Sequence, residues 1–471
     1  MAPYSSWHVF ALSGAATAED NAIAHERNMR FVIDTSVRLG IAPSAVRVLL
    51  ADGSDPAIDA HYEEPDATDR RRLYAIGLLH AGDESSRDAL QRMVNTSVPG
   101  ATAGDIASVQ HALHEDARSA VSHTDSPLLF YVTDHGRDTP HHDNGYIVLW
   151  GDHDIDVRAL GALFDEQPIE RRVVTVMSQC YSGAFSALVH EHGDPRRPLA
   201  RHDRCGYFAA PADRQSAGCT PETDEAHYDD YTTWFFAALG HRDRTGRPVL
   251  DADRNHDGSV SFDEAHLYAL VRDETTDVPV SSSEEYLRRA YSAWLTRLRT
   301  ARTPIREWLS SARPEIRDTA ERLLDSVGRD DSTTLATLAH DARVRRTTYA
   351  PALRETLDAL DAARASAHTS LRAAVAAHRI PGVAAGNITT LPVPAADRLV
   401  AAAEPYLSAI ERLEATADEL QRADDRVEAR LERIRRLAEL AALEAHAGSA
   451  GGDVQAAFGR IRRCETSAVD R

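Results

Sequence analysis

Two turns in this chain place a thiol and an imidazole directly after apolar runs. The run in SPLLFYVTDHG ends at His135, and the run in RRVVTVMSQCYSG ends at Cys180. In an open α/β sheet, reactive groups are delivered to the carboxyl edge of the strands. Gly136 and Gly183 follow the two residues closely and allow the backbone to turn sharply or approach a ligand. A thiol nucleophile with a proton-transfer partner predicts the chemistry of a cysteine peptidase.

The chemistry assigns a role to each group. A thiolate attacks a peptide carbonyl and the departing amine needs a proton, so Cys180 is the predicted nucleophile and His135 its partner. The backbone N–H groups of Cys180 and Gly136 are the predicted oxyanion donors. The alternative is structural, because a cysteine after an apolar run is often a buried small hydrophobe and DHG is often a turn. Their matched placement favours the catalytic interpretation.

The same segments carry a family resemblance. YVTDHG and SQCYSG resemble the His and Cys motifs of the caspase-like (clan CD) cysteine peptidases, closest to the legumain and bacterial caspase-like branch. GYFAAPADRQSAGC resembles the next strand and substrate-pocket loop of that family, and AHYDDYTTWFFAAL resembles the segment after it. The resemblance covers roughly residues 5–280. It implies a Cys-His dyad without an essential third member.

The resemblance also implies a primary substrate pocket. Legumain-like enzymes read Asn with an Arg-His pair near the first helix and with nearby acids. Here His25 is kept, Ala24 stands at the Arg position, and Asp230 matches an acid of the pocket. Asp213 in the pocket loop is expected to add a second carboxylate. Carboxylates without a cationic neighbour favour a cation, so cleavage after Arg or Lys is predicted. Legumain-like cleavage after Asn or Asp is the alternative, with both acids ordinary loop residues.

A second motif predicts a calcium site. Residues 253–264, DRNHDGSVSFDE, match the EF-hand loop, with Gly258 at its turn. The predicted ligands are Asp253, Asn255, Asp257, the Ser259 carbonyl, Ser261 and Glu264. The preceding GRPVL is not helical, so an EF-hand-like single loop is expected, holding Ca²⁺ as a structural or regulatory ion. The alternative is an acidic turn that matches by accident.

Alternating strands and helices must position these groups. Strand patterns cover residues 8–13, 45–50, 128–133, 173–178 and 205–210, and helical patterns cover 24–39, 103–121 and 231–239. Continuous apolar runs are typical of strands covered on both faces of a parallel sheet. Together with the resemblance, this predicts a caspase-like three-layer α/β domain over residues 1–284, with a mostly parallel sheet.

The remainder differs in composition. From about residue 285 to 448 the chain is rich in Ala, Leu, Arg and Glu, which predicts an all-α region. Three-and-four spacing of apolar residues over 413–434 favours a coiled coil there. Residues 449–471 are expected to form a loose tail. The legumain-like layout implies that the helical region restrains a zymogen until an activating protease cuts it. A recruitment or oligomerisation arm for a partner is the alternative.

Composition narrows the function further. The net charge is −20, and so acidic a surface argues against nucleic acid as the main partner. The cysteines are Cys180, Cys205, Cys219 and Cys464, and so few of them suit a reducing compartment. Cys205 is expected to be a buried strand thiol and Cys219 a loop thiol. The sequence has no apolar run long enough to predict a membrane span, so a cytoplasmic peptidase is expected. The rival functions are a catalytically idle helical adaptor and a calcium sensor.

Overall fold

The chain forms two compact units. The computed structural model describes residues 4–80, 90–121, 126–140, 142, 144–300, 302–348, 350–378 and 393–466. The first unit comprises Met1–Ala60, Asn95–Arg343 and Arg426–Arg471, and the second comprises His61–Val94 and Val344–Asp425. The predicted division between residues 284 and 285 is therefore not where the chain separates. Helices beyond 284 belong to the same unit as the sheet.

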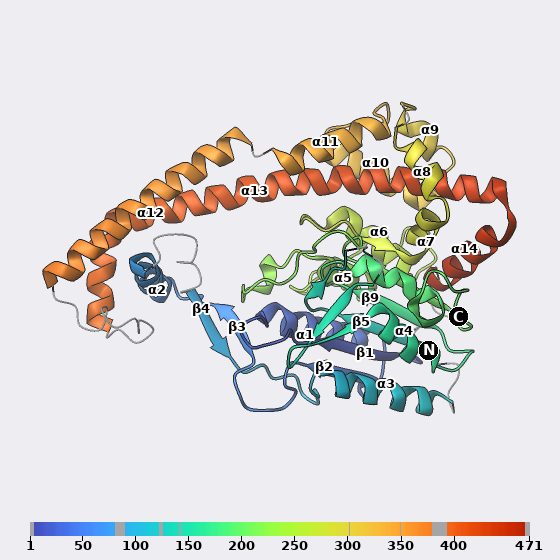
Figure 1. The fold of residues 1–471 in the computed structure, drawn as a ribbon, viewed down its shortest axis with the longest axis horizontal. Helices are drawn as coiled ribbons and strands as arrows, with labels where there is room; N and C mark the ends of the chain where they lie inside the picture. The colour runs from blue at the N-terminus through green and yellow to red at the C-terminus, as the bar shows by residue number, and fades with distance from the viewer. Residues whose placement is uncertain are drawn as a thin grey trace. The chain divides into compact units, whose positions relative to one another are not determined.

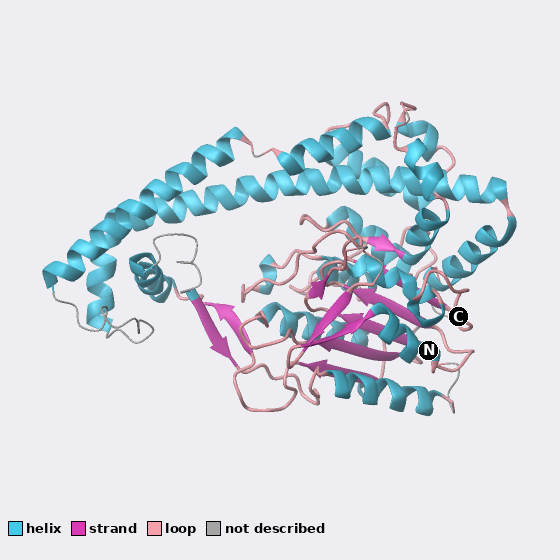
Figure 2. Ribbon diagram, in the orientation of Figure 1, coloured by secondary structure: helices cyan, strands magenta, loops and turns pink. Residues whose placement is uncertain are grey.

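A six-stranded sheet forms the centre of the first unit (Figures 1 and 2). Its spatial order is β11 (Val280–Ser281), β10 (Arg204–Phe208), β9 (Val173–Met177), β5 (Leu128–Val132), β1 (His8–Ser13) and β2 (Val46–Leu50). Only β11 is antiparallel to its neighbour. Strands β5, β9 and β10 are buried along their whole length, as expected of strands covered on both faces. The predicted α/β class with a mostly parallel sheet is confirmed.

Helices cover both faces of this sheet. On one face, α1 (Ile23–Arg38), α5 (Tyr231–Leu239) and α6 (Phe262–Arg272) share a core with Val9 and Ala11 of β1. On the other face, α3 (Ile106–Ala120) and α4 (Val157–Asp165) share a core with Phe10 and Leu12. Successive strand residues point to opposite faces, so one strand contributes to both cores. The result is a three-layer arrangement.

Shorter elements follow the strand ends. A three-stranded antiparallel sheet comprises β6 (Gly136–Arg137), β7 (Tyr146–Leu149) and β8 (His153–Asp156), where the sequence predicted a hairpin element. The 3-10 helices are η1 (Pro43–Ala45), η4 (Ser182–Val189), η5 (Glu191–Gly193) and η6 (Glu225–His227).

The C-terminal half is helical, as predicted. Its helices are α7 (Ser282–Ala290), α8 (Ser292–Leu298), α9 (Ile305–Leu309), α10 (Pro314–Ser326), α11 (Leu335–Thr347), α12 (Pro351–His378), α13 (Val393–Ala450) and α14 (Gly452–Glu465). The division between the units falls inside α11 and α13. Leu431 and Ile434 of α13 pack with Leu267 and Leu270 of α6, whereas Leu413 packs in the core of the second unit. The predicted 413–434 seam is therefore shared between two cores instead of forming one coiled coil.

The expectation of a loose tail is wrong. Residues 452–465 form α14, whose Ile461 and Cys464 enter the main core. Cys464 forms a disulfide with Cys205 of β10. The Glu465 carboxylate accepts hydrogen bonds from the N–H and hydroxyl of Ser283, at 2.8 and 2.6 Å. These long-range contacts fix the helix although its sequence is unremarkable; residues 467–471 lie outside the described part of the chain.

The disulfide also corrects the assignment of the cysteines. Cys205 is half of a cross-link and not the expected free strand thiol, while Cys180 and Cys219 are free. Disulfides persist mainly in oxidising compartments, so this bond disagrees with the expected reducing cytoplasm. Within the described residues, every helix is too short or too polar to span a bilayer.

The second unit is built from two distant segments. The first contributes β3 (Ala60–Glu63), α2 (Ala67–His80) and β4 (Gln91–Val94), and the other contributes α12 and part of α13. Leu73 and Leu78 of α2 pack with Leu371, Leu399 and Leu407. These two segments therefore form a small core of their own.

Candidate active site

His135 and Cys180 follow neighbouring strands at the same level of the sheet. Strands β5 and β9 pair in parallel, with Val132 opposite Met177. His135 and Cys180 each lie three residues beyond these partners. The strand register therefore brings the two predicted catalytic residues to one stretch of the carboxyl edge, where open α/β sheets bind ligands.

Gly136 lies directly against the backbone of Cys180. A Cβ atom at Gly136 would stand 1.9 Å from the Cys180 carbonyl oxygen, so no other residue fits without a backbone shift. The Val148 N–H donates to the His135 carbonyl at 3.0 Å, which makes Gly136 and Ile147 a non-hydrogen-bonded pair in the β6–β7 ladder. The Gly136 N–H consequently points away from β7 and is not used by the sheet.

The Cys180 turn has the features of a strained nucleophile turn. Tyr181 adopts a left-handed conformation with φ 59°, and its N–H donates to the Arg214 carbonyl at 2.8 Å. Among the described residues, the Cys180 N–H has no hydrogen-bond acceptor. The Cys180 thiol is partly buried and accepts from the Ser216 N–H at 3.4 Å. The two predicted oxyanion donors, the N–H groups of Cys180 and Gly136, are thus both left without a sheet partner.

The His135 ring faces a second thiol. Its Nε2 lies 2.8 Å from the Asp20 carbonyl, and its Nδ1 lies 3.8 Å from the Sγ of Cys219. Within the described residues no hydrogen bond joins His135 to Cys180. Catalytic hydrogen bonds are often long without substrate, so this leaves the dyad assignment open to test. Cys219, expected to be only a loop thiol, belongs to the site.

Asp134 has a structural role beside His135. Its Oδ1 accepts from the N–H groups of Ala15 and His135, at 3.0 and 2.7 Å. These bonds join the residues that follow β1 and β5 and fix the height of the His135 turn. Desolvation by complete burial raises the pKa of Asp134 well above its usual value.

The three predicted pocket residues lie in three different environments. His25 of α1 is fully buried, and its ring meets that of His135 edge to face at 5.4 Å between centroids. Asp230 is buried at the N-cap of α5, where its Oδ1 accepts from the Thr233 N–H at 2.7 Å. A Cβ on Gly218 would lie 3.2 Å from Asp230 Oδ2, so this acid borders the pocket loop. Asp213 is exposed on the surface, which is the position that the alternative interpretation, an ordinary loop acid, expects.

A buried arginine, Arg244, lies near Asp230. Arg244, with 2% of its side chain exposed, donates to the Asn28 side-chain oxygen and to the Thr233 hydroxyl, the latter at 2.8 Å. Asn28 in turn donates to Asp230 Oδ2 at 3.4 Å. Arg244 therefore reaches Asp230 through Asn28, while its own ion pair is with Glu225 at 3.3 Å. Sequence reasoning missed this arginine, because it is remote from α1 along the chain.

The pocket loop is fastened by the C-terminal half. The Ala217 N–H donates to Asp277 at 2.6 Å, and Arg214 pairs with Glu428 of α13. Arg433 of α13 is fully buried and donates to the carbonyls of Asp277, Asp273 and Leu270, at 2.8, 2.6 and 3.0 Å. Glu428 and Arg433 of α13 thus hold the segments beside Cys180.

The predicted calcium loop has the expected backbone. Gly258 has φ 87°, and its N–H donates to Asp253 at 2.9 Å, which turns the chain back on itself. Asn255 and Asp257 accept N–H bonds from within the loop, from Asp257 and Ser259 at 2.8 and 3.0 Å. The six predicted ligands therefore lie on one compact turn, and their oxygen chemistry suits Ca²⁺.

Glu264 has a second role that affects the fit. Ser261 and Glu264 form a capping box at the start of α6, with Glu264 Oε2 accepting from the Ser261 N–H at 2.9 Å. Glu264 Oε1 accepts from the N–H groups of Arg254 and Asn255. A bound ion would have to exchange some of these bonds for its own. The oxygen donors suit calcium in type, but in this structure Asp253, Asp257 and Glu264 do not lie close enough together to share one ion, and they accept the loop's own N–H groups.

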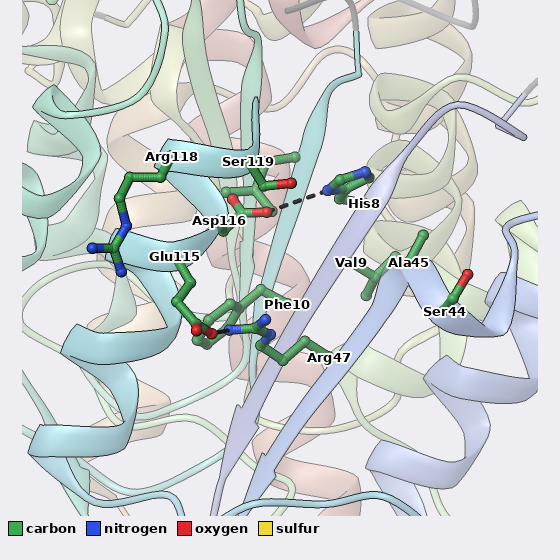
Figure 3. Close-up of a pocket in the computed structure, with 11 residues that line it drawn as sticks. His8, Val9, Phe10, Ser44, Ala45, Arg47, Glu115, Asp116, Arg118 and Ser119 are labelled. Atoms are coloured by element: carbon green, nitrogen blue, oxygen red, sulfur yellow. Dashed lines mark hydrogen bonds and ion pairs between the residues drawn. The ribbon is translucent and has the colours of Figure 1, made fainter. Parts of the chain in front are cut away.

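A separate cavity lies at the opposite edge of the sheet. It measures about 440 Å³ and is lined by the first residues of β1 and β2 and by α3 (Figure 3). Two pairs lie in its lining, His8 with Asp116 and Arg47 with Glu115. The loops after the strands, where the thiols lie, are at the other end, so this cavity is not part of the candidate site.

Comparisons with known proteins do not assign the chain. No family model and no curated protein matches it. A search of solved structures returned Raptor from Chaetomium thermophilum, at 12% identity and a TM-score of 0.25. The alignment covers 98% of this chain and 51% of that one, so this chain spans about half of its length. A TM-score this low supports no argument about fold or function.

Proposed function

We propose that the protein is a cysteine endopeptidase with a caspase-like three-layer domain and a Cys180–His135 dyad. The observation that carries the proposal is the pairing of Val132 with Met177, together with the contact of Gly136 with the Cys180 backbone. A thiol, an imidazole and two backbone N–H groups that make no sheet hydrogen bond then lie together at the carboxyl ends of neighbouring strands. This combination suits acyl transfer to a thiolate.

The mechanism follows from these positions. The Cys180 thiolate attacks the scissile carbonyl, and the N–H groups of Cys180 and Gly136 stabilise the oxyanion. His135 donates a proton to the leaving amine and then accepts one from the attacking water. Asp20 and Asp134 keep the His135 turn in place through backbone and side-chain hydrogen bonds. Removing one oxyanion donor in such a site typically costs about 100- to 1000-fold in rate.

Substrate preference depends on Asp230. Its buried carboxylate borders the pocket loop and supports a basic residue, Arg or Lys, before the scissile bond. Arg244 acts against this through Asn28, so the preference for Arg over Asn is expected to be modest. Matched peptides that differ only in Arg, Lys, Asn or Asp at that position measure it. Faster cleavage after Asn would favour the legumain-like alternative.

Regulation is proposed to act through the same supports. Calcium in the 253–264 loop would stabilise the start of α6, and α13 fastens the pocket loop through Arg433 and Glu428. Removing residues 285–471 would strip α14 and the Cys205–Cys464 bond from the core, so this deletion cannot test a restraint. Point changes on α13 test it without unfolding the sheet.

The proposal is tested by labelling with an electrophilic peptide probe, followed by mass spectrometry. Cys180 should carry the label in the wild-type chain, and both Cys180→Ala and His135→Ala should abolish it while the melting temperature stays unchanged. His111→Ala, an exposed histidine on α3, is the matched control and should label normally. Undiminished labelling of Cys180→Ala would sink the proposal. A folded wild-type chain that neither labels nor cleaves peptides would favour the idle adaptor.

A further inference from the structure

Two side chains that the dyad does not account for, His25 and Cys219, converge on His135. The Sγ of Cys219 lies 3.5 Å from His25 Nε2 and 3.8 Å from His135 Nδ1. All three atoms lie within 4.8 Å of one another. Among the His, Cys, Asp and Glu side chains in the described part of the chain, these three have ligand atoms close enough together to bind one metal ion.

Hydrogen bonds on the far sides of both rings orient their nitrogens. Asn21 donates its amide to the Asp59 carbonyl at 2.8 Å, which turns its side-chain oxygen towards His25 Nδ1, 2.9 Å away. His25 therefore carries its proton on Nδ1 and its lone pair on Nε2. His135 carries its proton on Nε2, because that atom faces the Asp20 carbonyl at 2.8 Å, and its lone pair is on Nδ1. Both lone pairs are thus directed towards Cys219.

This arrangement matches a zinc site in donor type, outer hydrogen bonds and spacing. Histidines that bind zinc usually donate their other N–H to a carbonyl or carboxylate, as both do here. Bond lengths of about 2.3 Å to sulfur and about 2.0 Å to nitrogen at a tetrahedral angle imply a sulfur–nitrogen separation of about 3.5 Å. The distance from Cys219 to His25, 3.5 Å, equals that value, and the distance to His135, 3.8 Å, is slightly longer. Hard cations such as Ca²⁺ and Mg²⁺ prefer oxygen and do not suit two imidazoles and a thiolate.

We propose that His25 Nε2, His135 Nδ1 and Cys219 Sγ bind one Zn²⁺, and that the bound ion switches the peptidase off. Binding releases the Cys219 thiol proton to solvent and forms three bonds to the metal, with no change of oxidation state. The fourth position is open to water, since Cys219 is exposed. The inhibitory part rests on the proposed function: His135 cannot transfer protons while its Nδ1 lone pair is held by the ion.

Metal binding is measured first, without reference to activity. Metal-free, reduced full-length protein is titrated with Co²⁺ and with Zn²⁺ against a chromophoric chelator. One ion per chain is expected, with a near-ultraviolet thiolate-to-cobalt band. Cys219→Ser should lose the band and weaken Zn²⁺ binding by about 100-fold or more, whereas Cys180→Ala and His111→Ala should retain both. Cys219 is exposed, so this variant should fold; melting curves check that it does.

A second variant separates this site from adventitious binding to the chain's 22 histidines. Asn21→Leu removes the acceptor behind His25, together with the bond to the Asp59 carbonyl, but leaves the three ligands in place. Loss of such an outer partner typically weakens metal binding about 10- to 100-fold. Equal affinity in wild type, Cys219→Ser and Asn21→Leu would overturn the site.

The switch is then read from probe labelling of Cys180 with and without Zn²⁺. Labelling should fall as the site fills and return on chelation, at the zinc concentration found in the titration. Full labelling of zinc-loaded protein would overturn the inhibitory role. If metal-free protein binds zinc as predicted but never labels or cleaves, the proposed peptidase fails and the metal site stands.

Discussion

At the scale of single residues, the two free thiols of the candidate site differ in their relation to His135. His135 follows the strand next to that of Cys180, yet its Nδ1 faces Cys219 at 3.8 Å. Desolvation by the surrounding loops, and then the neighbouring Cys180, raise the pKa of the Cys219 thiol, although the residue keeps an exposed surface. Cys219 is therefore a poor nucleophile without a metal, and Cys180 remains the better candidate.

Gly136→Ala tests the contact between the two turns. The added Cβ would stand 1.9 Å from the Cys180 carbonyl oxygen, so the turns must separate. Probe labelling of Cys180 is expected to fall at least tenfold. Gly459→Ala on α14 is the control, because its Cβ would meet only a flexible arginine at 3.7 Å, and it should label normally. A Gly136→Ala chain that labels at the wild-type rate would mean that the turns are not in contact.

Asp116→Asn tests a buried ion pair at the opposite edge of the sheet. The Arg171 side chain is fully buried and pairs with Asp116 at 2.5 Å. Burial raises the pKa of Asp116, but hydrogen bonds from His8 and Arg171 outweigh it, and the net pKa is below the usual value. Leaving Arg171 unpaired should lower the free energy of unfolding by about 3–5 kcal/mol at neutral pH.

The pH dependence of that loss follows from the sign of the shift. An acid with a lowered folded pKa contributes stability above its unfolded pKa of about 3.9, and this contribution disappears as pH falls through the folded value. The difference between wild type and Asp116→Asn, from urea unfolding, should therefore shrink below pH 4. Glu115→Gln is the control, since its pair with Arg47 is exposed and worth at most about 1 kcal/mol. If the difference in free energy of unfolding between wild type and Asp116→Asn does not change with pH, Asp116 is not the ionised partner of Arg171.

At the scale of elements, local sequence predicted the 253–264 loop, which is held both by bonds within the loop and by Glu264 of the helix that follows it. Ca²⁺ is expected to raise the melting temperature, because a ligand that binds only the folded state stabilises it. Glu264→Gln should abolish that gain. It keeps a side chain able to complete the capping box with Ser261, so the metal-free protein should lose no more than about 1 kcal/mol.

Glu315→Gln is the matched control for calcium. Glu315 lines a cavity beside the loop with Asn255 and Asp257, but lies outside the motif. Its response to Ca²⁺ should equal that of the wild type in differential scanning fluorimetry. A wild-type melting temperature that is the same after chelation and after calcium addition would show that the loop binds no stabilising calcium ion.

Helix α13 links the element scale to the site. Arg433 pairs with Asp273 inside the unit and also holds the Asp277 carbonyl. Arg433→Met should leave Asp273 without its cation, at a cost of about 3–5 kcal/mol. It should also release Ala217 and reduce Cys180 labelling. Arg426→Met, on the same helix but with a third of its side chain exposed, should change neither by much. Equal effects of the two variants would show that α13 does not position the pocket loop.

At the scale of the whole molecule, a single disulfide joins residues 259 positions apart. In the chain-entropy view, closing so long a loop stabilises the fold by about 5 kcal/mol, since the unfolded chain loses freedom. Cys464→Ser should lower the midpoint of denaturant unfolding under oxidising conditions. Reductant should lower the wild type to the same value and leave the variant unchanged. Identical midpoints for oxidised wild type and variant would mean that the bond does not form.

Local pattern was enough to predict much of the fold. Apolar runs of strand length gave the five parallel strands, because a strand covered on both faces needs apolar side chains at every position. The same runs fixed where His135 and Cys180 would stand, since a parallel sheet aligns strand ends at one edge. The calcium motif was also readable, because its ligands lie within twelve consecutive residues.

Tertiary structure decided everything that depends on distant partners. Nothing near Cys219 in sequence indicates that two histidines on α1 and after β5 direct their lone pairs to it. The same holds for Arg244 beside Asp230, for α14 in the core, and for the second unit built from 61–94 and 344–425. Sequence patterns encode which face of an element is buried; they do not encode what covers that face. That is settled only when segments hundreds of residues apart pack together.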